Sequence, residues 1–238
     1  MRILILTVAV AALFCTSQAK AAVFFDESFE STLTSSGWST GSCNPTDPNW
    51  ATNYSDGCNP ARSTDIAHSG THSLKGPYIG LDSGNWVDHT YTTTTEIYHR
   101  FWYRTHAFTY NNPGTKNFFV GDGVHYPNFW INHYAGSREF SVYTQLGSDT
   151  QAPCPGENHD CIYVPNTASV PINDDQWYCV EDHIKLNTPG VADGVVEMWV
   201  NGILTIQYTN RTIRSTTPDC NSCSSSNAAF NFERIFVQ

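Results

Sequence analysis

Apolar and polar residues alternate along most of the chain, and turn-forming residues recur about every ten positions. The apolar runs are rich in β-branched and aromatic residues, and none has the apolar spacing of a long helix. This pattern predicts strands that each bury one face. The predicted strands cover residues 23–30, 71–79, 96–106, 117–121, 127–134, 138–146, 176–187, 194–201, 203–209 and 230–237.

The segments 39–62, 147–173 and 210–229 are rich in Pro, Asn, Ser and Cys, which is typical of loops. No repeat, helical linker or change of composition divides the chain. The pattern therefore predicts one all-β domain, a sandwich of two antiparallel sheets. The first and last strands share an apolar and acidic alternation, so we expect them to pair and to cover the N-terminal edge.

The hairpin at 176–202 has polar residues at alternate positions of two otherwise apolar strands, with Asp182 out of pattern on the apolar face. A turn in its Pro-Gly segment sets Glu197 across from His183, and Trp199 across from Glu181. Cross-strand neighbours have Cβ atoms about 5 Å apart. The hairpin is therefore predicted to present these four side chains as one patch.

Three other predicted strands also have one face rich in aromatic and planar polar residues. Their residues are Arg100, Trp102 and Arg104, then Trp130, Asn132 and Tyr134, then Ser141, Tyr143 and Gln145. Such side chains bind sugars through the apolar faces of the rings and through the hydroxyls. A solvated or partner-covered face is the alternative, but such faces seldom carry this much Trp and Tyr. We expect these residues and the hairpin patch to form one carbohydrate-binding face.

The N-terminus has the features of a secretory signal peptide: an arginine, a short apolar run and small residues near Ala19 and Ala21. The run is too short to span a bilayer comfortably, and Phe14 before Cys15 does not suit a lipid-attachment site. We expect residues 1–21 to be removed and residues 22–238 to form one domain, secreted to the periplasm or the extracellular space. The net charge of −10 argues against binding to nucleic acid or anionic membranes. We expect a monomer with a polysaccharide as its partner.

Eight cysteines are present, and only Cys15 lies in the signal peptide. In an oxidising compartment, disulfides are favoured over metal ligation. Three pairs are predicted disulfide cysteines: Cys43 with Cys58, Cys154 with Cys161, and Cys220 with Cys223, the last closing on itself or on another cysteine. A redox role for the last pair is disfavoured, because it lies in a Ser/Thr-rich loop. Cys179 is left as the odd, buried thiol.

Four segments, in this order, resemble a known superfamily: FDESFE, AHSGTHSLKG, EIYHRFWYR and the hairpin WYCVEDHIKLNTPG…DG…EMWVNG. The chain resembles the concanavalin A-like lectin/glucanase superfamily. Within it, the chain is most similar to the jelly-roll polysaccharide lyases that cleave alginate, glucuronan and related polyuronates. The resemblance implies a β-jelly-roll with carbohydrate lying across the concave face of one bent sheet.

The resemblance also implies β-elimination on a uronate-containing polysaccharide. In that reaction the uronate carboxylate is neutralised, a base removes the adjacent proton, and an acid protonates the leaving oxygen. We predict that Arg100 and Gln145 neutralise the carboxylate and that His183 and Tyr143 act as base and acid, with Lys185 as a further proton carrier. The predicted substrate-binding residues are Arg104, Trp102, Trp130, Asn132, Tyr134, Glu181, Glu197 and Trp199. Lys116, in NNPGTKNF, resembles the lysine of a Gly-Gly-Lys segment in some of these lyases, with Thr115 in place of the second glycine.

Two other functions stay open. Glu181 and Glu197 have the side-chain chemistry of a glycosidase pair, but the E-x-D-x-x-E strand of the superfamily's glucanases is absent. A non-catalytic binding or adhesion module would use Trp102, Trp130 and Trp199 as sugar platforms. The resemblance further implies a structural calcium ion near the chain ends, held by Asp26, Glu30 and Glu233. The histidine spacings in HYPNFWINH and HRFWYRTH are poor zinc signatures, and no other cofactor is expected.

Overall fold

The computed structural model describes residues 27–33, 35, 37–40, 61–75, 85–106, 116–122, 125–133, 137–154, 159–216 and 226–237. The strands in them are β1 (Ser39–Thr40), β2 (Ala61–Ser63), β3 (Ser73–Lys75), β4 (Asn85–Thr94), β5 (Glu96–Tyr103), β6 (Lys116–Gly121), β7 (Asn128–His133), β8 (Phe140–Gly147), β9 (His159–Tyr163), β10 (Tyr178–Lys185), β11 (Gly194–Val200), β12 (Ile203–Arg211) and β13 (Phe230–Val237). Within these ranges we find no helix with the length and apolarity needed to cross a membrane.

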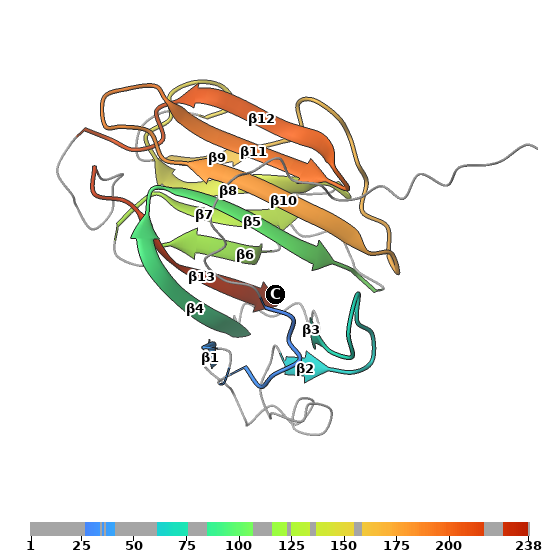
Figure 1. Cartoon of the computed structure of the whole chain (residues 1–238). Coiled ribbons are helices and arrows are strands. Elements are labelled where there is room, and N and C mark those ends of the chain that lie inside the picture. Colours follow the sequence, from blue (N-terminus) through green and yellow to red (C-terminus); the bar gives the residue numbers. More distant parts are fainter. Residues whose placement is uncertain are drawn as a thin grey trace, which may run out of the picture.

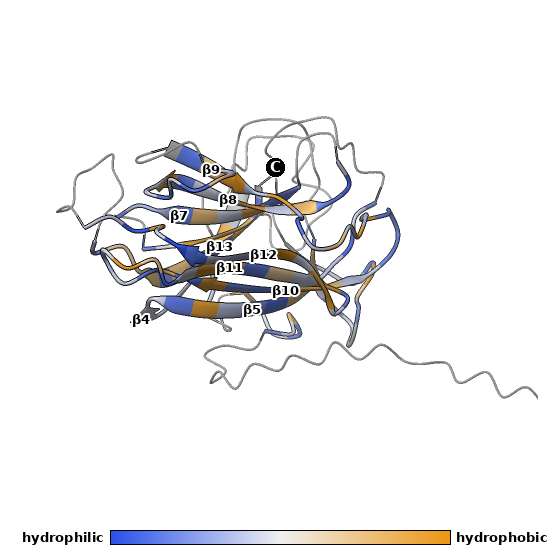
Figure 2. Ribbon diagram, turned by 90° about the horizontal axis from the view of Figure 1, so that it is seen from above, coloured by the Kyte–Doolittle hydropathy of each residue, from blue (hydrophilic) through white to orange (hydrophobic). Residues whose placement is uncertain are grey.

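Two antiparallel sheets stack face to face. One has seven strands in the order β1-β4-β13-β6-β7-β8-β9, and the other has four in the order β12-β11-β10-β5; β2 and β3 form a separate pair (Figure 1). Seen from above, β7, β8 and β9 lie in one layer and β5, β10, β11 and β12 in the other (Figure 2). The prediction of an all-β sandwich is confirmed, and the arrangement is consistent with a β-jelly-roll.

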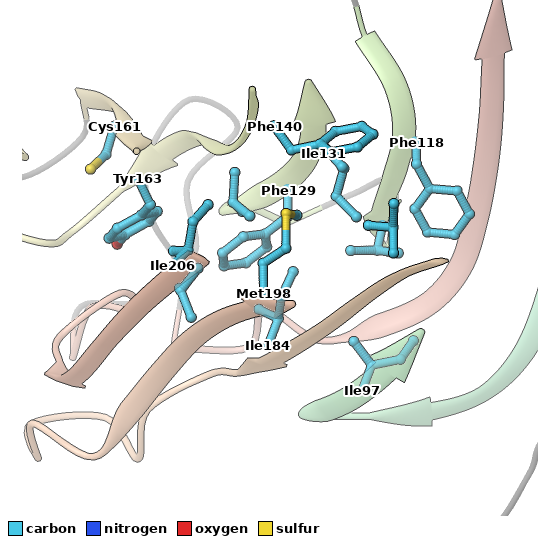
Figure 3. Close-up of a cluster of buried hydrophobic side chains, with 14 of the residues drawn as sticks. Ile97, Phe118, Phe129, Ile131, Phe140, Cys161, Tyr163, Ile184, Met198 and Ile206 are labelled. Atoms are coloured by element: carbon cyan, nitrogen blue, oxygen red, sulfur yellow. The ribbon is translucent and has the colours of Figure 1, made fainter. Parts of the chain in front are cut away.

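The main core fills the space between the two sheets (Figure 3). Ile184, Met198 and Ile206 of the four-stranded sheet and Phe129 and Ile131 of the seven-stranded sheet are almost completely buried in it. Burying each such side chain contributes about 1.5–3 kcal/mol. Because successive residues of a strand point to opposite faces, the residues that alternate with these core positions point outward from each sheet.

Four strands were not expected, and one expected pairing is wrong. The sequence pattern missed the short strands β1 and β2, in and at the end of a segment predicted to be a loop, and β9, inside another. It also missed β4, whose inward face carries the polar His89. The last strand, β13, does not pair with the first predicted strand. It lies between β4 and β6, with Ile235 opposite Val87. Residues 27–30 form no strand, and residues 23–26 lie outside the described ranges.

The unexpected position of Asp182 is explained by a polar cluster between the sheets. His99 Nδ1 lies 2.9 Å from Asp182 Oδ2. Glu233 Oε2 lies 3.6 Å from His99 Nε2, and Glu233 Oε1 lies 3.6 Å from His89 Nδ1. Burial alone would lower the pKa of His99, but Asp182 and then Glu233 raise it above its ordinary value. The four residues come from both sheets, so the cluster joins the sheets inside the sandwich.

The predicted Cys154–Cys161 disulfide is present, with a Cα–Cα distance of 4.8 Å. The prediction that Cys179 is a free thiol is wrong, because it is disulfide-bonded. Cys179 lies opposite Trp102 on the outward side of β10, so its sulfur is directed away from the core. The other predicted disulfide residues, Cys43, Cys58, Cys220 and Cys223, lie outside the described ranges.

Candidate functional site

The outward side of the four-stranded sheet carries the predicted hairpin patch. Glu181 pairs with Trp199, and His183 with Glu197, in the register that the turn predicted. On the other side of β10, Arg100 lies opposite Glu181 and Tyr98 opposite His183. The patch therefore extends across β5, β10 and β11, and we name it the four-stranded face.

Charged groups on the four-stranded face bind one another. Arg100 Nε and Nη2 are each 2.8 Å from Glu181 Oε1. His183 contacts two carboxylates: Nδ1 lies 3.0 Å from Glu197 Oε2 and Nε2 lies 2.8 Å from Glu96 Oε1. With both ring nitrogens engaged, His183 is poorly suited to act as a general base.

The remaining predicted residues of these strands also have protein partners. Lys185 Nζ lies 3.3 Å from Asp193, a carboxylate that also accepts a 2.6 Å hydrogen bond from the Thr188 amide in the hairpin turn. Arg104 Nη2 lies 2.6 Å from Asp175. Both cations thus fix loops, and neither is directed at the centre of the patch.

Trp130, Asn132, Tyr143 and Gln145 lie on the other sheet, on the outward side of β7 and β8. Trp130 pairs with Tyr143, and Asn132 with Ser141. The prediction of one combined face is wrong, because the core separates these residues from the four-stranded face. In particular, the structure does not bring Arg100 and His183 together with Gln145 and Tyr143. Tyr134 lies outside the described ranges.

One cross-strand row runs over the outward side of the seven-stranded sheet, which we name the seven-stranded face. In register across β4, β13, β6, β7, β8 and β9 are Asp88, Arg234, Phe119, Trp130, Tyr143 and Ile162. The rings of Phe119 and Trp130 meet edge to face with centroids 4.4 Å apart. An aromatic floor therefore crosses the middle of this face, next to Tyr143.

Tyr143 is held in its neutral form. Its hydroxyl donates a hydrogen bond to Asp160 Oδ2, and Asp160 Oδ1 accepts a 3.0 Å hydrogen bond from the Leu146 amide. Burial and then the Asp160 carboxylate raise the pKa of Tyr143 well above its ordinary value of 10.0. A phenol that keeps its proton at neutral pH is unsuited to remove one, and it could donate its own proton only after leaving the hydrogen bond to Asp160.

Two amides of β7 are buried on the same face. Asn132 is 5% exposed and Asn128 is 7% exposed, and within the described part of the chain the Oδ1 atom of each has no hydrogen-bond partner. The Asn128 amide lies directly over Gly121, where an added Cβ atom would come within 2.1 Å of Oδ1. A buried polar atom without a partner costs about 1–3 kcal/mol.

Sequence reasoning missed Asn128, Asp160 and Gly121 as parts of this face. Asn128 has the same strand parity as Trp130, so the alternation of β7 was enough to find it. Asp160 lies in a predicted loop, and its contact with Tyr143 depends on the unexpected pairing of β8 with β9.

The two predicted calcium ligands that the structure describes, Glu30 and Glu233, each contact other groups. Glu233 contacts the two histidines inside the sandwich, and Asp26 lies outside the described ranges. Glu30 Oε1 accepts hydrogen bonds from the amides of Thr71 (2.7 Å) and His72 (2.9 Å). Among the described residues, no group of three or more His, Cys, Asp or Glu side chains has the arrangement of a metal site. Calcium binding stays a prediction.

Glu30 is expected to make folding stability depend on pH. Hydrogen bonds from Thr71 and His72 lower its pKa from 4.5 to about 2. A lowered folded-state pKa gives stability that is complete above pH 4.5 and is lost as the pH falls toward 2. Glu30→Gln should lower the melting temperature at neutral pH and flatten its decline over this acid range. Melting temperatures of both proteins are measured by circular dichroism at stepped pH values. Plots of melting temperature against pH that run parallel for wild type and Glu30→Gln would contradict the prediction.

No protein-family model matches the sequence, and no curated protein matches it closely enough to count as a relative. Among solved structures, the chain is similar to the endo-β-1,4-glucuronan lyase from the fungus Trichoderma reesei, at 14% identity and a TM-score of 0.49 over 75% of each chain. It is also similar to alginate lyase vAL-1 from Chlorella virus, at 16% identity and a TM-score of 0.42 over 71% of this chain and 70% of that one. A third similar structure is the marine PL-14 alginate lyase from Aplysia kurodai, at 13% identity and a TM-score of 0.39 over 74% of this chain and 85% of that one. These proteins are of the class that the sequence resembles, but nothing about activity follows from such distant similarity.

Proposed function

We propose that this protein is a secreted polysaccharide lyase that cleaves a uronate-containing polymer by β-elimination on the seven-stranded face. One observation carries the proposal. A phenol held in its neutral form, Tyr143, lies in register with an aromatic floor and beside strand positions that carry amides. Elimination needs a proton donor, a neutralising group and a sugar platform within one site.

Asn132 is the proposed neutralising group, and Gln145, on the far side of the Trp130–Tyr143 pair, would bind a neighbouring sugar unit. Their strand positions are neighbours of Trp130 and Tyr143 on the same side of β7 and β8. An amide N–H donor stabilises the charge that develops on the uronate carboxylate once the adjacent proton is removed. Trp130, which is 8% exposed, would form part of the floor beneath the sugar, and Tyr143 would protonate the leaving oxygen.

Lys116 is the proposed base. Its backbone pairs with Asn132 in the register of β6 and β7. The segment that contains it also resembles the Gly-Gly-Lys segment of some jelly-roll lyases. A lysine in this role must be neutral when it accepts the proton.

The contacts of the four-stranded face argue against chemistry there. His183 has a carboxylate at each ring nitrogen, and Glu181 is bound by Arg100. An acid–base role for either residue would first require breaking these contacts. The same contacts disfavour Glu181 and Glu197 as a glycosidase pair.

Matched variants on the two sheets separate the alternatives. The purified protein is incubated with glucuronan and with alginate, and absorbance from unsaturated uronate is followed together with reducing ends. We expect both signals to rise with at least one polymer, and His183→Ala to retain the wild-type rate. Lys116→Met should lower the rate at least ~100-fold. A wild-type protein inactive on both polymers, or loss of activity in His183→Ala with folding intact, would contradict the proposal.

Secretion is part of the proposal and rests on two observations. The Cys154–Cys161 disulfide is typical of oxidising compartments, and the N-terminal sequence has the features of a signal peptide. Expression of the full-length chain with its own N-terminus, followed by mass spectrometry of the exported product, tests it. We expect a product that begins near residue 20 or 22.

A further inference from the structure

We propose that the four-stranded face is a second carbohydrate-binding surface, separate from the catalytic face, and that it binds a neutral polysaccharide. The proposal does not rest on β-elimination, because it concerns the opposite sheet. It stands on three properties of the described residues: exposed aromatic rings, polar groups that are already ordered, and an excess of negative charge.

Exposed aromatic rings distinguish this face from the seven-stranded one. Tyr98 is 41% exposed and Trp102 is 42% exposed, whereas Trp130 and Phe119 on the other sheet are only 8% and 6% exposed. Tyr98 and Trp102 lie on the same side of β5, four residues apart, which corresponds to about 13 Å along a strand. This separation suits contact with more than one sugar unit of an extended chain.

Each of the two rings stacks on a histidine among the described residues. The ring of Tyr98 stacks on His183 with centroids 4.1 Å apart and planes within 3°. The ring of Trp102 stacks on His68 with centroids 3.6 Å apart. Burial lowers the pKa of His68, which favours the neutral imidazole in this stack. The rings are thereby fixed in orientation while large parts of their surfaces stay open to solvent.

The polar groups between the rings are already ordered. Arg100 holds Glu181, and His183 holds Glu96 and Glu197. Gln207 on β12 donates a further hydrogen bond of 3.0 Å to Glu197. An ionised carboxylate has about four acceptor positions, so these groups can still accept hydrogen bonds from sugar hydroxyls. Because their side chains are held before binding, little conformational entropy is lost when a ligand docks.

The charge of the face selects the ligand class. Three carboxylates, those of Glu96, Glu181 and Glu197, are set against one guanidinium and one imidazole. Lys185 adds no net charge, because Asp193 pairs with it. A polyuronate carries one carboxylate on each uronate unit and would be repelled by this arrangement. A neutral glycan with many hydroxyl donors complements it.

Affinity electrophoresis of the native full-length protein tests the proposal. The gels contain hydroxyethyl cellulose, mixed-linkage β-glucan or galactomannan, with an alginate gel for comparison. We expect retardation in at least one neutral gel. Trp102→Ala and Tyr98→Ala should each weaken that binding at least tenfold, while Trp102→Phe should retain most of it.

Controls keep this result distinct from the result for the proposed lyase. Tyr143→Phe should bind the neutral glycan as wild type does, and Trp102→Ala should retain its rate on a soluble polyuronate. Circular dichroism establishes that each variant is folded. The proposal is overturned if no neutral gel retards the protein, if both alanine variants bind like wild type, or if Tyr143→Phe loses neutral-glycan binding to the same degree as Trp102→Ala.

Discussion

Replacing Tyr143 by phenylalanine is expected to lower kcat for β-elimination at least ~100-fold, the size of effect typical of a general acid. The substitution removes one hydroxyl and keeps the ring that pairs with Trp130 across β7 and β8. Its partner Asp160 is exposed, so the lost hydrogen bond should affect stability little. The loss should therefore lie in kcat, with KM and the melting temperature close to wild type.

Tyr98→Phe is the matched control, because it removes the same hydroxyl from a strand of the opposite sheet. Tyr98 donates a 3.3 Å hydrogen bond to Glu96, as Tyr143 donates one to Asp160. We expect this variant to retain the wild-type kcat. Equal losses in both variants, or an unchanged kcat in Tyr143→Phe, would show that the proton donor has been assigned wrongly.

Arg211→Ala is expected to lower the free energy of unfolding by about 3–5 kcal/mol, because it leaves a carboxylate buried without its cation. The side chains of Arg211 and Asp149 are 5% and 1% exposed, and Arg211 Nε lies 2.5 Å from Asp149 Oδ2. The guanidinium also donates to the backbone oxygens of Gln151 (2.6 Å) and Ala152 (3.2 Å). Arg211 therefore connects β12 to the segment between β8 and the Cys154–Cys161 disulfide.

Urea unfolding followed by circular dichroism measures this loss, and two variants test its cause. Asp149→Asn, combined with Arg211→Met, removes both charges and should recover part of the stability lost in Arg211→Ala. Arg234→Ala breaks a more exposed ion pair with Asp88 (27% and 21% exposed side chains) and should cost less than about 1 kcal/mol. Similar losses for Arg211→Ala and Arg234→Ala would contradict the role assigned to burial.

Features that depend on local geometry could be predicted from the sequence. Alternation along each strand gives the side on which a residue lies, and a short turn gives the register of its hairpin. The pairs Glu181–Trp199 and His183–Glu197 are therefore present as expected. The Cys154–Cys161 disulfide closes a loop of only a few residues, and it too could be predicted.

Features that depend on distant segments could not be predicted. Alternation does not show which sheet a strand joins, so the outward residues of β5 and β10 were grouped with those of β7 and β8. Asp182 looked out of place because its partner His99 is 83 positions away in the chain, on β5. Glu233 looked like a metal ligand because nothing in its own strand indicates the two histidines that contact it inside the sandwich.

The most direct test of catalysis on the seven-stranded face is a time course on glucuronan and alginate for wild type, Tyr143→Phe and His183→Ala. Unsaturated-uronate absorbance and reducing ends are recorded in the same samples. We expect the two signals to rise together in wild type and in His183→Ala, and to be nearly absent in Tyr143→Phe. Reducing ends without new absorbance, or activity that His183→Ala abolishes and Tyr143→Phe retains, would contradict it.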